Sequence, residues 1–455
     1  MPPQGSASGS SSGSRRTHSS TTRRRFLAAG TAAAAAGSAG CLSSIVGGGG
    51  SSADTVTVAA VEGSGRLFQR LVDDYVSEQV NFEVDVSLFP YANLFEKTSS
   101  VLTTEGTAYD IVFMDDPWFP QFAQHCAPLR DHLPGELPTD QLIETTVDIA
   151  TWPAPKGPVV PSAQDMEEQI RGQVVVGNTQ LFAYNQAYYE EVGMSEPQTW
   201  EDVYEAGSAI SEQIDGANGY IIRGKRGNPI NANFFGLGNS RIGDMFDEDW
   251  RYQWNSDDGV DTLDFYVNDL AGISPDGVSS FDSDRVLNSL GDGTAAQSPA
   301  WPSAASLLLD PEEAEEADNI KFTVLPEGIR RAPQQGNWIA AINSYVSDDK
   351  KAAAGEVIQE AISKEAQNRY VELGGVPFRH DTFEDNMDAQ PWFPALYESL
   401  QTAKWRPRTP LWSEVAVTQG ENFNSALTGE ISPSEALANI QEDVESIMDD
   451  AGYYD

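Results

Sequence analysis

The alternating order of strand and helix patterns most constrains the fold of this chain. Short apolar runs typical of buried strands cover 56–60 and 111–114, and residues 82–88 alternate apolar and polar residues. Between these runs, apolar residues recur at helical spacing over about 67–76 and 91–102. Strands that alternate with helices form a parallel sheet whose crossovers are helical. We therefore predict an α/β fold.

The pattern restarts after a proline-rich stretch at 153–161. Further extended segments are predicted at 174–184, 219–223, 322–326 and 338–345, and helices are predicted to begin after Thr199, Ser347 and Ser432. The roughly 400 residues that follow the N-terminal region are enough for two domains. The restart in the middle of the chain therefore predicts two α/β lobes.

The N-terminal region, 1–53, has the layout of an export signal followed by a Gly/Ser-rich linker. Arg23 and Arg24, before Phe-Leu, resemble the twin-arginine signal, and the small residues before Cys41 resemble a lipoprotein processing site. Ser38 departs from that site, which usually carries Leu, Val or Ile at this position. This resemblance implies lipidation of Cys41 and anchoring at the outer face of the cytoplasmic membrane. The alternative is an Ala-rich leader with incidental arginines.

The charge is strongly acidic, with a formal net charge of -41 from 69 acidic residues and 28 lysines and arginines. A hydrophobic content of 40% argues against disorder, so we interpret the acids as the surface of a folded, halophilic protein. Such a field repels phosphates and excludes nucleic acid as a partner. Acidic residues are so common here that a pair of them carries no information about catalysis.

Cysteine and histidine are scarce. The two cysteines are Cys41 and Cys126, so lipidation of Cys41 would leave Cys126 without a disulfide partner. His125 and His132 lie near Cys126, but their spacing matches no strong metal motif. We expect no metal and no cofactor.

Several segments resemble the extracellular solute-binding proteins of ATP-binding-cassette importers, in the branch that binds sugars. They occur in order along nearly the whole chain after the leader, at 109–115, 182–186, 197–202, 323–326, 336–338, 374–377, 403–408 and 429–433. The resemblance implies a two-lobed, periplasmic-binding-protein-like fold of type II, in which the lobes close on a ligand by hinge motion. It also implies a carbohydrate as ligand, a membrane permease as partner, a monomer, and no enzymatic activity.

The resemblance also implies lobe boundaries. Lobe 1 would comprise 54–178 and 326–346, and lobe 2 would comprise 179–325 and 347–455. The chain would cross between the lobes near Asn178–Ala183, Val324–Pro326 and Tyr345–Asp348.

Candidate ligand-binding residues are aromatic or charged and follow predicted strands or match positions of the family. Sugar ring faces pack on flat aromatic rings, while hydroxyls need paired donors and acceptors. The candidates are Trp338, Asp115, Trp301, Glu62, Arg66, Asp116, Trp118, Arg406 and Arg408. Asp115 could instead cap a helix, Glu62 and Arg66 could lie in a solvated loop, and Trp118 fits the core of lobe 1 slightly better. Tyr91 is a weaker candidate, which fits packing better.

The basic candidates bear on the charge of the ligand. An anionic ligand would need several clustered basic groups, and Arg66, Arg406 and Arg408 are the three among the candidates. A neutral sugar is therefore expected, although an amine or cation also suits the negative field.

The alternative functions are an exported carbohydrate hydrolase and a binding protein for a non-sugar solute. The sequence has no Gly-x-Ser-x-Gly or His-Glu-x-x-His motif and only four histidines, which gives little support to an enzyme.

Overall fold

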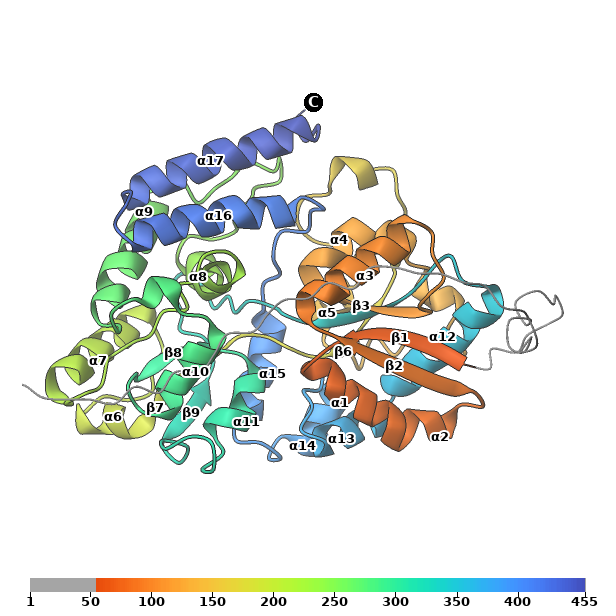
Figure 1. Cartoon of the computed structure of the whole chain (residues 1–455), viewed down its shortest axis with the longest axis horizontal. Coiled ribbons are helices and arrows are strands. Elements are labelled where there is room, and N and C mark those ends of the chain that lie inside the picture. Colours follow the sequence, from red (N-terminus) through yellow and green to blue (C-terminus); the bar gives the residue numbers. More distant parts are fainter. Residues whose placement is uncertain (1–54, 455) are drawn as a thin grey trace, which may run out of the picture. The chain divides into compact units, whose positions relative to one another are not determined.

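The computed structural model describes residues 55–454, which form two groups of strands and helices (Figure 1). The larger sheet has the strand order β2 (Glu83–Phe89), β1 (Thr55–Val61), β3 (Ile111–Asp115), β10 (Trp338–Ile342) and β6 (Gln173–Val176). β1 runs parallel to β2 and β3, whereas β10 is antiparallel to β3 and β6. This sheet forms the core of the first lobe.

Helices cover both sides of the larger sheet. Figure 1 shows α3 (Tyr91–Thr103) and α4 (Phe119–Phe122) on one side, with α1 (Ser64–Leu71) and α13 (Lys364–Glu372) on the other. Leu94, Thr98 and Leu102 of α3 are buried at helical spacing. α1 continues through a wide turn, Val72–Val76, into α2 (Ser77–Gln79). The predicted β-α-β-α-β order of the first lobe is confirmed.

The smaller sheet has the antiparallel strand order β8 (Gln297–Ala300), β7 (Leu181–Asn185) and β9 (Ile320–Thr323). The helices of the second lobe that precede β9 are α6 (Gln186–Glu191), α7 (Trp200–Gln213), α8 (Asn228–Arg241), α9 (Asp257–Asp264), α10 (Ser283–Gly291) and α11 (Ala305–Leu308). Two long helices follow late in the chain, α16 (Trp412–Leu427) and α17 (Pro433–Asp450), and they pack against α8, α9 and each other. This group forms the second lobe.

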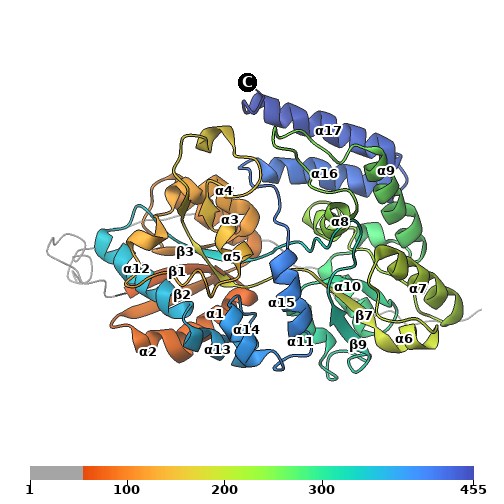
Figure 2. The same ribbon diagram turned by 180° about the vertical axis from the view of Figure 1, so that it is seen from behind.

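The remaining helices and short strands lie before β6 or after β10 in the sequence. They are α5 (Glu144–Asp148), the short pair β4 (Thr151–Trp152) and β5 (Gln169–Ile170), α12 (Asp348–Ala361), α14 (His380–Asn386) and α15 (Phe393–Thr402). Figure 2 shows α15 between the two groups of strands, and α15 contacts α5 as well as β7 and β9.

The assignment of residues 347–455 to the second lobe is wrong for α12 and α13. α12 packs against β1, β6 and β10 of the larger sheet, and α13 packs against α1. Lys350 reinforces this placement through its contact with Asp110, at 3.4 Å. The chain therefore stays with the first lobe after Tyr345–Asp348 instead of leaving it there.

The predicted strand at 219–223 does not form. The amide of Tyr220 bonds to Ile273 and that of Ile221 bonds to Gln297, both at 3.1 Å. Because these two acceptors lie on different segments, the extended chain builds no continuous ladder with one partner strand.

Three crossing segments join the lobes: 177–180, 333–337 and 403–408. The amides of Gln180 and Gly336 bond to the carbonyls of Gln334 and Asn178, at 3.0 and 2.9 Å. The amide of Gln335 bonds to Lys404, also at 2.9 Å. Hydrogen bonds therefore tie the three segments together side by side.

Candidate functional site

One edge of the larger sheet gathers most of the predicted site residues. Asp115 ends β3 and is paired with Trp338, which begins β10. Glu62 follows β1, and its amide bonds to the carbonyl of Phe89 at the end of β2, which places Tyr91 nearby. Ligands of open α/β sheets bind outside the carboxyl ends of strands, which is where these residues lie.

A buried charge cluster lies at this edge. Nη2 of Arg406 lies 2.8 Å from a carboxylate oxygen of Asp115 and 2.9 Å from one of Asp116. Arg408 donates to the carbonyls of Asp116 and Thr151, at 3.4 and 3.3 Å. All four charged side chains are buried, so two carboxylates and two guanidiniums neutralise each other at a point where water is excluded.

Burial shifts the pKa values of this cluster. Desolvation raises the pKa of Asp116 to about 7, an effect that Asp115 adds to and Arg406 opposes. Desolvation lowers the pKa of Arg408 to about 10. For Arg406 the two carboxylates outweigh desolvation, and its pKa rises. Asp116 is thus the member of the cluster whose charge changes near neutral pH.

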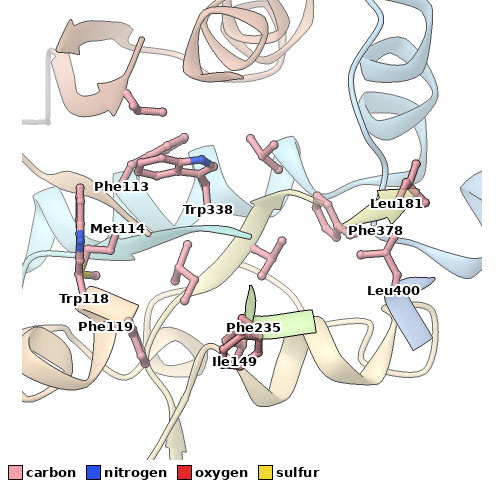
Figure 3. Packing of buried hydrophobic residues seen from close by; sticks show 14 of the residues in the cluster. Phe113, Met114, Trp118, Phe119, Ile149, Leu181, Phe235, Trp338, Phe378 and Leu400 are labelled. Carbon is pink, nitrogen blue, oxygen red and sulfur yellow. The ribbon is translucent and has the colours of Figure 1, made fainter. Parts of the chain in front are cut away.

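Three aromatic rings surround the cluster. The ring centroid of Trp118 lies 5.8 Å from that of Trp338 and 4.6 Å from that of Tyr91, in edge-to-face geometry. Figure 3 shows Trp338 and Trp118 together, close to Phe113 and Met114 of β3. Both tryptophans are buried, whereas Tyr91 is 43% exposed. Tyr91 therefore presents the open ring surface of the three.

The hydroxyl of Tyr91 connects the rings to the charges. It donates to Asp115 at 2.8 Å, and desolvation of this hydroxyl, with the nearby charge of Asp115, raises the pKa of Tyr91 well above its usual value, although the residue as a whole is 43% exposed. Tyr91 was predicted as a weaker candidate that fits packing better, and it does pack on Trp118 and Trp338. Its hydroxyl bond to Asp115 is the added observation that makes it a candidate for the proposed site.

Trp301 lies at the edge of the smaller sheet, directly after β8. It contacts the crossing segments, because a Cβ atom added to Gly336 would lie 2.9 Å from Cζ3 of Trp301. Gly336 is two residues before Trp338 in the chain. The structure therefore brings the two predicted tryptophans to the same crossing segment, from opposite lobes.

Glu62 and Arg66 remain apart from the cluster. Both side chains are exposed, and neither forms an ion pair within residues 55–454. No side-chain hydrogen bond or ion pair with residues 55–454 fixes the orientation of either side chain.

A cavity with a volume of about 830 Å³ lies against the third crossing segment. Its walls come from the first-lobe loop 156–158, from α8 and the segment that follows it, and from 401–408. Aromatic lining residues are Phe235, Phe246, Trp250 and Trp405, and charged ones include Lys156, Asp244, Arg331 and Lys404. Of the predicted site residues, Arg408 alone lines this cavity. Arg408 thus belongs both to the lining of this cavity and to the sheet-edge cluster, so the two sites are adjacent.

Two further searches concern the described chain. Between residues 55 and 454 no group of three or more histidine, cysteine or acidic side chains is arranged to hold a metal ion. Over the same residues, no helix combines the length and the apolar character needed to cross a bilayer.

Comparisons with known proteins agree with the two-lobed architecture. The family model described as "Bacterial extracellular solute-binding protein" matches residues 59–368. The protein named "Probable amino-acid ABC transporter periplasmic-binding protein y4oP" of Sinorhizobium fredii is 25% identical over 405 residues, which is 87% of this chain and 90% of that protein. The mannitol-binding protein of Pseudomonas aeruginosa is 27% identical over 293 residues, or 59% of this chain and 67% of that protein.

A solved structure extends the agreement to the fold. Maltose-bound MalE3 of T. maritima superposes with a TM-score of 0.73 at 22% identity, covering 86% of this chain and 99% of that one. At this level of identity the likeness concerns the fold, which is two-lobed and mixed α/β in both proteins.

Proposed function

Because this chain belongs to the family of bacterial extracellular solute-binding proteins, we propose that it captures a carbohydrate outside the cell and delivers it to an ATP-binding-cassette importer. The observation that carries this proposal is the combination of Tyr91, Asp115 and Arg406 at one sheet edge, with Trp301 reaching the crossing segments from the other lobe. The names of a mannitol-binding relative and a maltose-bound structure support the same class of ligand.

The chemistry of this site suits a hydroxyl-bearing ligand. The exposed ring of Tyr91 offers a flat surface for the C–H groups of a sugar or polyol. Asp115 accepts hydrogen bonds, and Arg406 holds its carboxylate in a fixed orientation at 2.8 Å. Because the side chain of this acceptor is already ordered, binding of a hydroxyl to it causes a smaller loss of conformational entropy.

Closure of the lobes would bring Tyr91 and Asp115 of the first lobe toward Trp301 of the second lobe. The chain passes from one lobe to the other through the three crossing segments, which are hydrogen-bonded to one another. A hinge motion must therefore occur in these segments. We infer that the ligand lies between Tyr91 and Trp301 and that the protein acts as a monomer.

Family membership implies an exported protein. We propose in addition that Arg23 and Arg24 belong to a twin-arginine signal and that Cys41 carries a lipid anchor. These residues lie outside the described range. Replacement of Cys41 by serine would release the protein from membranes into the medium if the anchor is real.

Binding without turnover is the second part of the proposal, since the family consists of transport proteins. The test is a thermal-shift and calorimetric screen of maltose, glucose, mannitol and ribitol in concentrated KCl, with chromatography of the sugars afterwards. At a hundredfold excess over Kd a ligand adds about 2.7 kcal/mol of stability. Saturable binding with intact sugar supports the proposal, whereas shortened sugar indicates a hydrolase.

An amino acid is the second candidate ligand, because the name of the Sinorhizobium relative refers to one. The twenty amino acids therefore belong in the same screen. Binding of an amino acid without binding of any carbohydrate would replace the proposed ligand class while keeping the transport function.

A further inference from the structure

A small cavity in the second lobe contains an arginine that the binding proposal does not use. It has a volume of about 30 Å³ and is lined by Arg223, Trp301, Gln180 and Asn233, among others. Gln180 belongs to the first crossing segment, and its amide bonds to Gln334 of the second, at 3.0 Å. The cavity therefore lies beside the same tryptophan and the same crossing segments as the proposed ligand.

Arg223 lacks an acidic partner. No carboxylate of residues 55–454 lies within 4.0 Å of its guanidinium nitrogens, and Nε is buried without an acceptor. Asp282 and Asp284 act on it from a greater distance, and Asp282 is occupied by Lys225 at 3.2 Å. Arg223 is partly buried, and desolvation lowers its pKa. A partly desolvated cation without a counter-ion is costly, so a partner from outside the chain would be stabilising.

The first lobe provides no spare negative charge for this arginine. There Arg406 pairs with both Asp115 and Asp116, and all three side chains are buried. Arg223 has no ion pair of this kind within residues 55–454. A carboxylate on the ligand would give it the acidic partner that these residues do not supply.

Resting on the proposed function, we propose that Arg223 binds a carboxylate of the ligand and that the solute is therefore a sugar acid, such as a uronic or aldonic acid. A guanidinium holds a carboxylate through two parallel hydrogen bonds, which gives orientation as well as affinity. The sugar carbons next to that carboxylate would pack on Trp301. A cavity of about 30 Å³ holds a water molecule or two, which one carboxylate oxygen can replace.

The test uses two pairs of probes that differ in the acidic group: D-glucuronate against D-glucose, and D-gluconate against D-glucitol. Calorimetric titrations in concentrated KCl compare wild type with Arg223→Gln, Arg223→Lys and Arg226→Gln. Arg226 is an exposed arginine three residues further along the chain, so its variant loses the same charge outside the cavity. Circular dichroism and thermal unfolding check that each variant folds.

We expect at least one acid to bind wild type and Arg226→Gln at least tenfold more tightly than its neutral counterpart. Arg223→Gln should remove that preference, because it should weaken binding of the acid at least tenfold. The affinity for neutral sugars should change less than threefold. Arg223→Lys should keep part of the preference. Equal binding of acids and neutral sugars by wild type, or an acid preference that survives in Arg223→Gln, overturns the role of Arg223. Failure of every acid and every neutral sugar to bind wild type instead overturns the proposed function itself.

Discussion

Asp116 is the member of the buried charge cluster whose pKa the fold shifts toward neutral pH. It is buried beside Asp115, and the two carboxylates share the guanidinium of Arg406 at 2.8 and 2.9 Å. Desolvation of the carboxylate, together with the nearby charge of Asp115, outweighs the attraction of Arg406, so the fold favours a proton on Asp116 near neutral pH. The cluster is therefore a pH-dependent part of the proposed site.

We expect this proton to affect stability in a defined direction. The pKa of Asp116 rises to about 7 in the folded state, so between pH 4 and 7 the native protein holds a proton that the unfolded chain releases. Asp116 should therefore lower stability as pH rises, by up to about 1.4 kcal/mol per pH unit. Denaturant unfolding of wild type and Asp116→Asn from pH 4 to 8 measures this as the slope of their difference. A flat difference would mean that Asp116 stays ionised throughout.

Substitution of Trp338 distinguishes between two candidate ligand sites, the sheet-edge cluster and the 830 Å³ cavity. We predict that Trp338→Ala weakens carbohydrate binding at least tenfold, because Tyr91 and Trp118 lose the ring that supports them at 6.0 and 5.8 Å. Trp405→Ala is the matched control, since Trp405 lines the 830 Å³ cavity. Isothermal titration should show less than a threefold change for the control. The reverse result would move the ligand into the cavity.

Sequence patterns predicted single residues where the chemistry is local. Asp115 was recognisable because it ends a buried strand, and the cap role considered for it is also present, since its Oδ1 accepts from the amide of Asp116 at 2.9 Å. The role proposed for Arg223 could not be predicted from the sequence, because it depends on the absence of acidic partners from distant segments of the described chain. The hydroxyl bond of Tyr91 to Asp115 could not be predicted for a related reason, since it spans 24 positions of the chain.

At the scale of elements, the crossing segments connect the proposed site to the movement of the lobes. Asn337 accepts from the amide of Asn178 at 2.6 Å, so the residue before Trp338 is held by the neighbouring crossing segment. A rearrangement of these segments must therefore displace Trp338 as well. Ligand contact and lobe movement are thereby coupled through the same few residues.

Gly336 gives the element-scale prediction. A Cβ atom there would lie 2.9 Å from both Cζ3 of Trp301 and Nδ2 of Asn178. Gly336→Ala should therefore displace the ring of Trp301, cost about 1–3 kcal/mol of stability and weaken binding at least tenfold. Gly272→Ala is the control, because nothing lies within 4 Å of its added Cβ. Unchanged affinity in Gly336→Ala would show that Trp301 does not need its present position to bind the ligand.

Elements with strong local signals were predictable, and their placement was less so. Thr199 and Asp202 form the predicted capping box at the start of α7. The helix after Ser347 also forms, but its amphipathic pattern could not specify which sheet it covers. The extended stretch at 219–223 shows the same limit, because its apolar residues signal burial and say nothing about the partner of its amides.

For the whole molecule, we propose that the excess of acidic residues influences the conditions under which the lobes are stable. The 69 acidic residues outnumber the 28 basic ones, and the first 40 residues contribute five arginines and no acid. The described chain is therefore more negative than the net charge of -41 for the full sequence. Like charges on a compact body repel one another and favour the expanded state.

We predict that concentrated salt stabilises the protein by screening this repulsion. The Debye length falls from about 10 Å at 0.1 M to about 3 Å at 1 M, which is shorter than most separations between surface charges. Tm should rise between these concentrations of KCl, by about 2–4 °C for each kcal/mol of repulsion removed. Sucrose of equal osmolality is the control, because it strengthens burial without screening charge. If sucrose raises Tm as much as KCl does, exclusion of solute from the surface explains the stabilisation, and the carboxylates have no specific role in it.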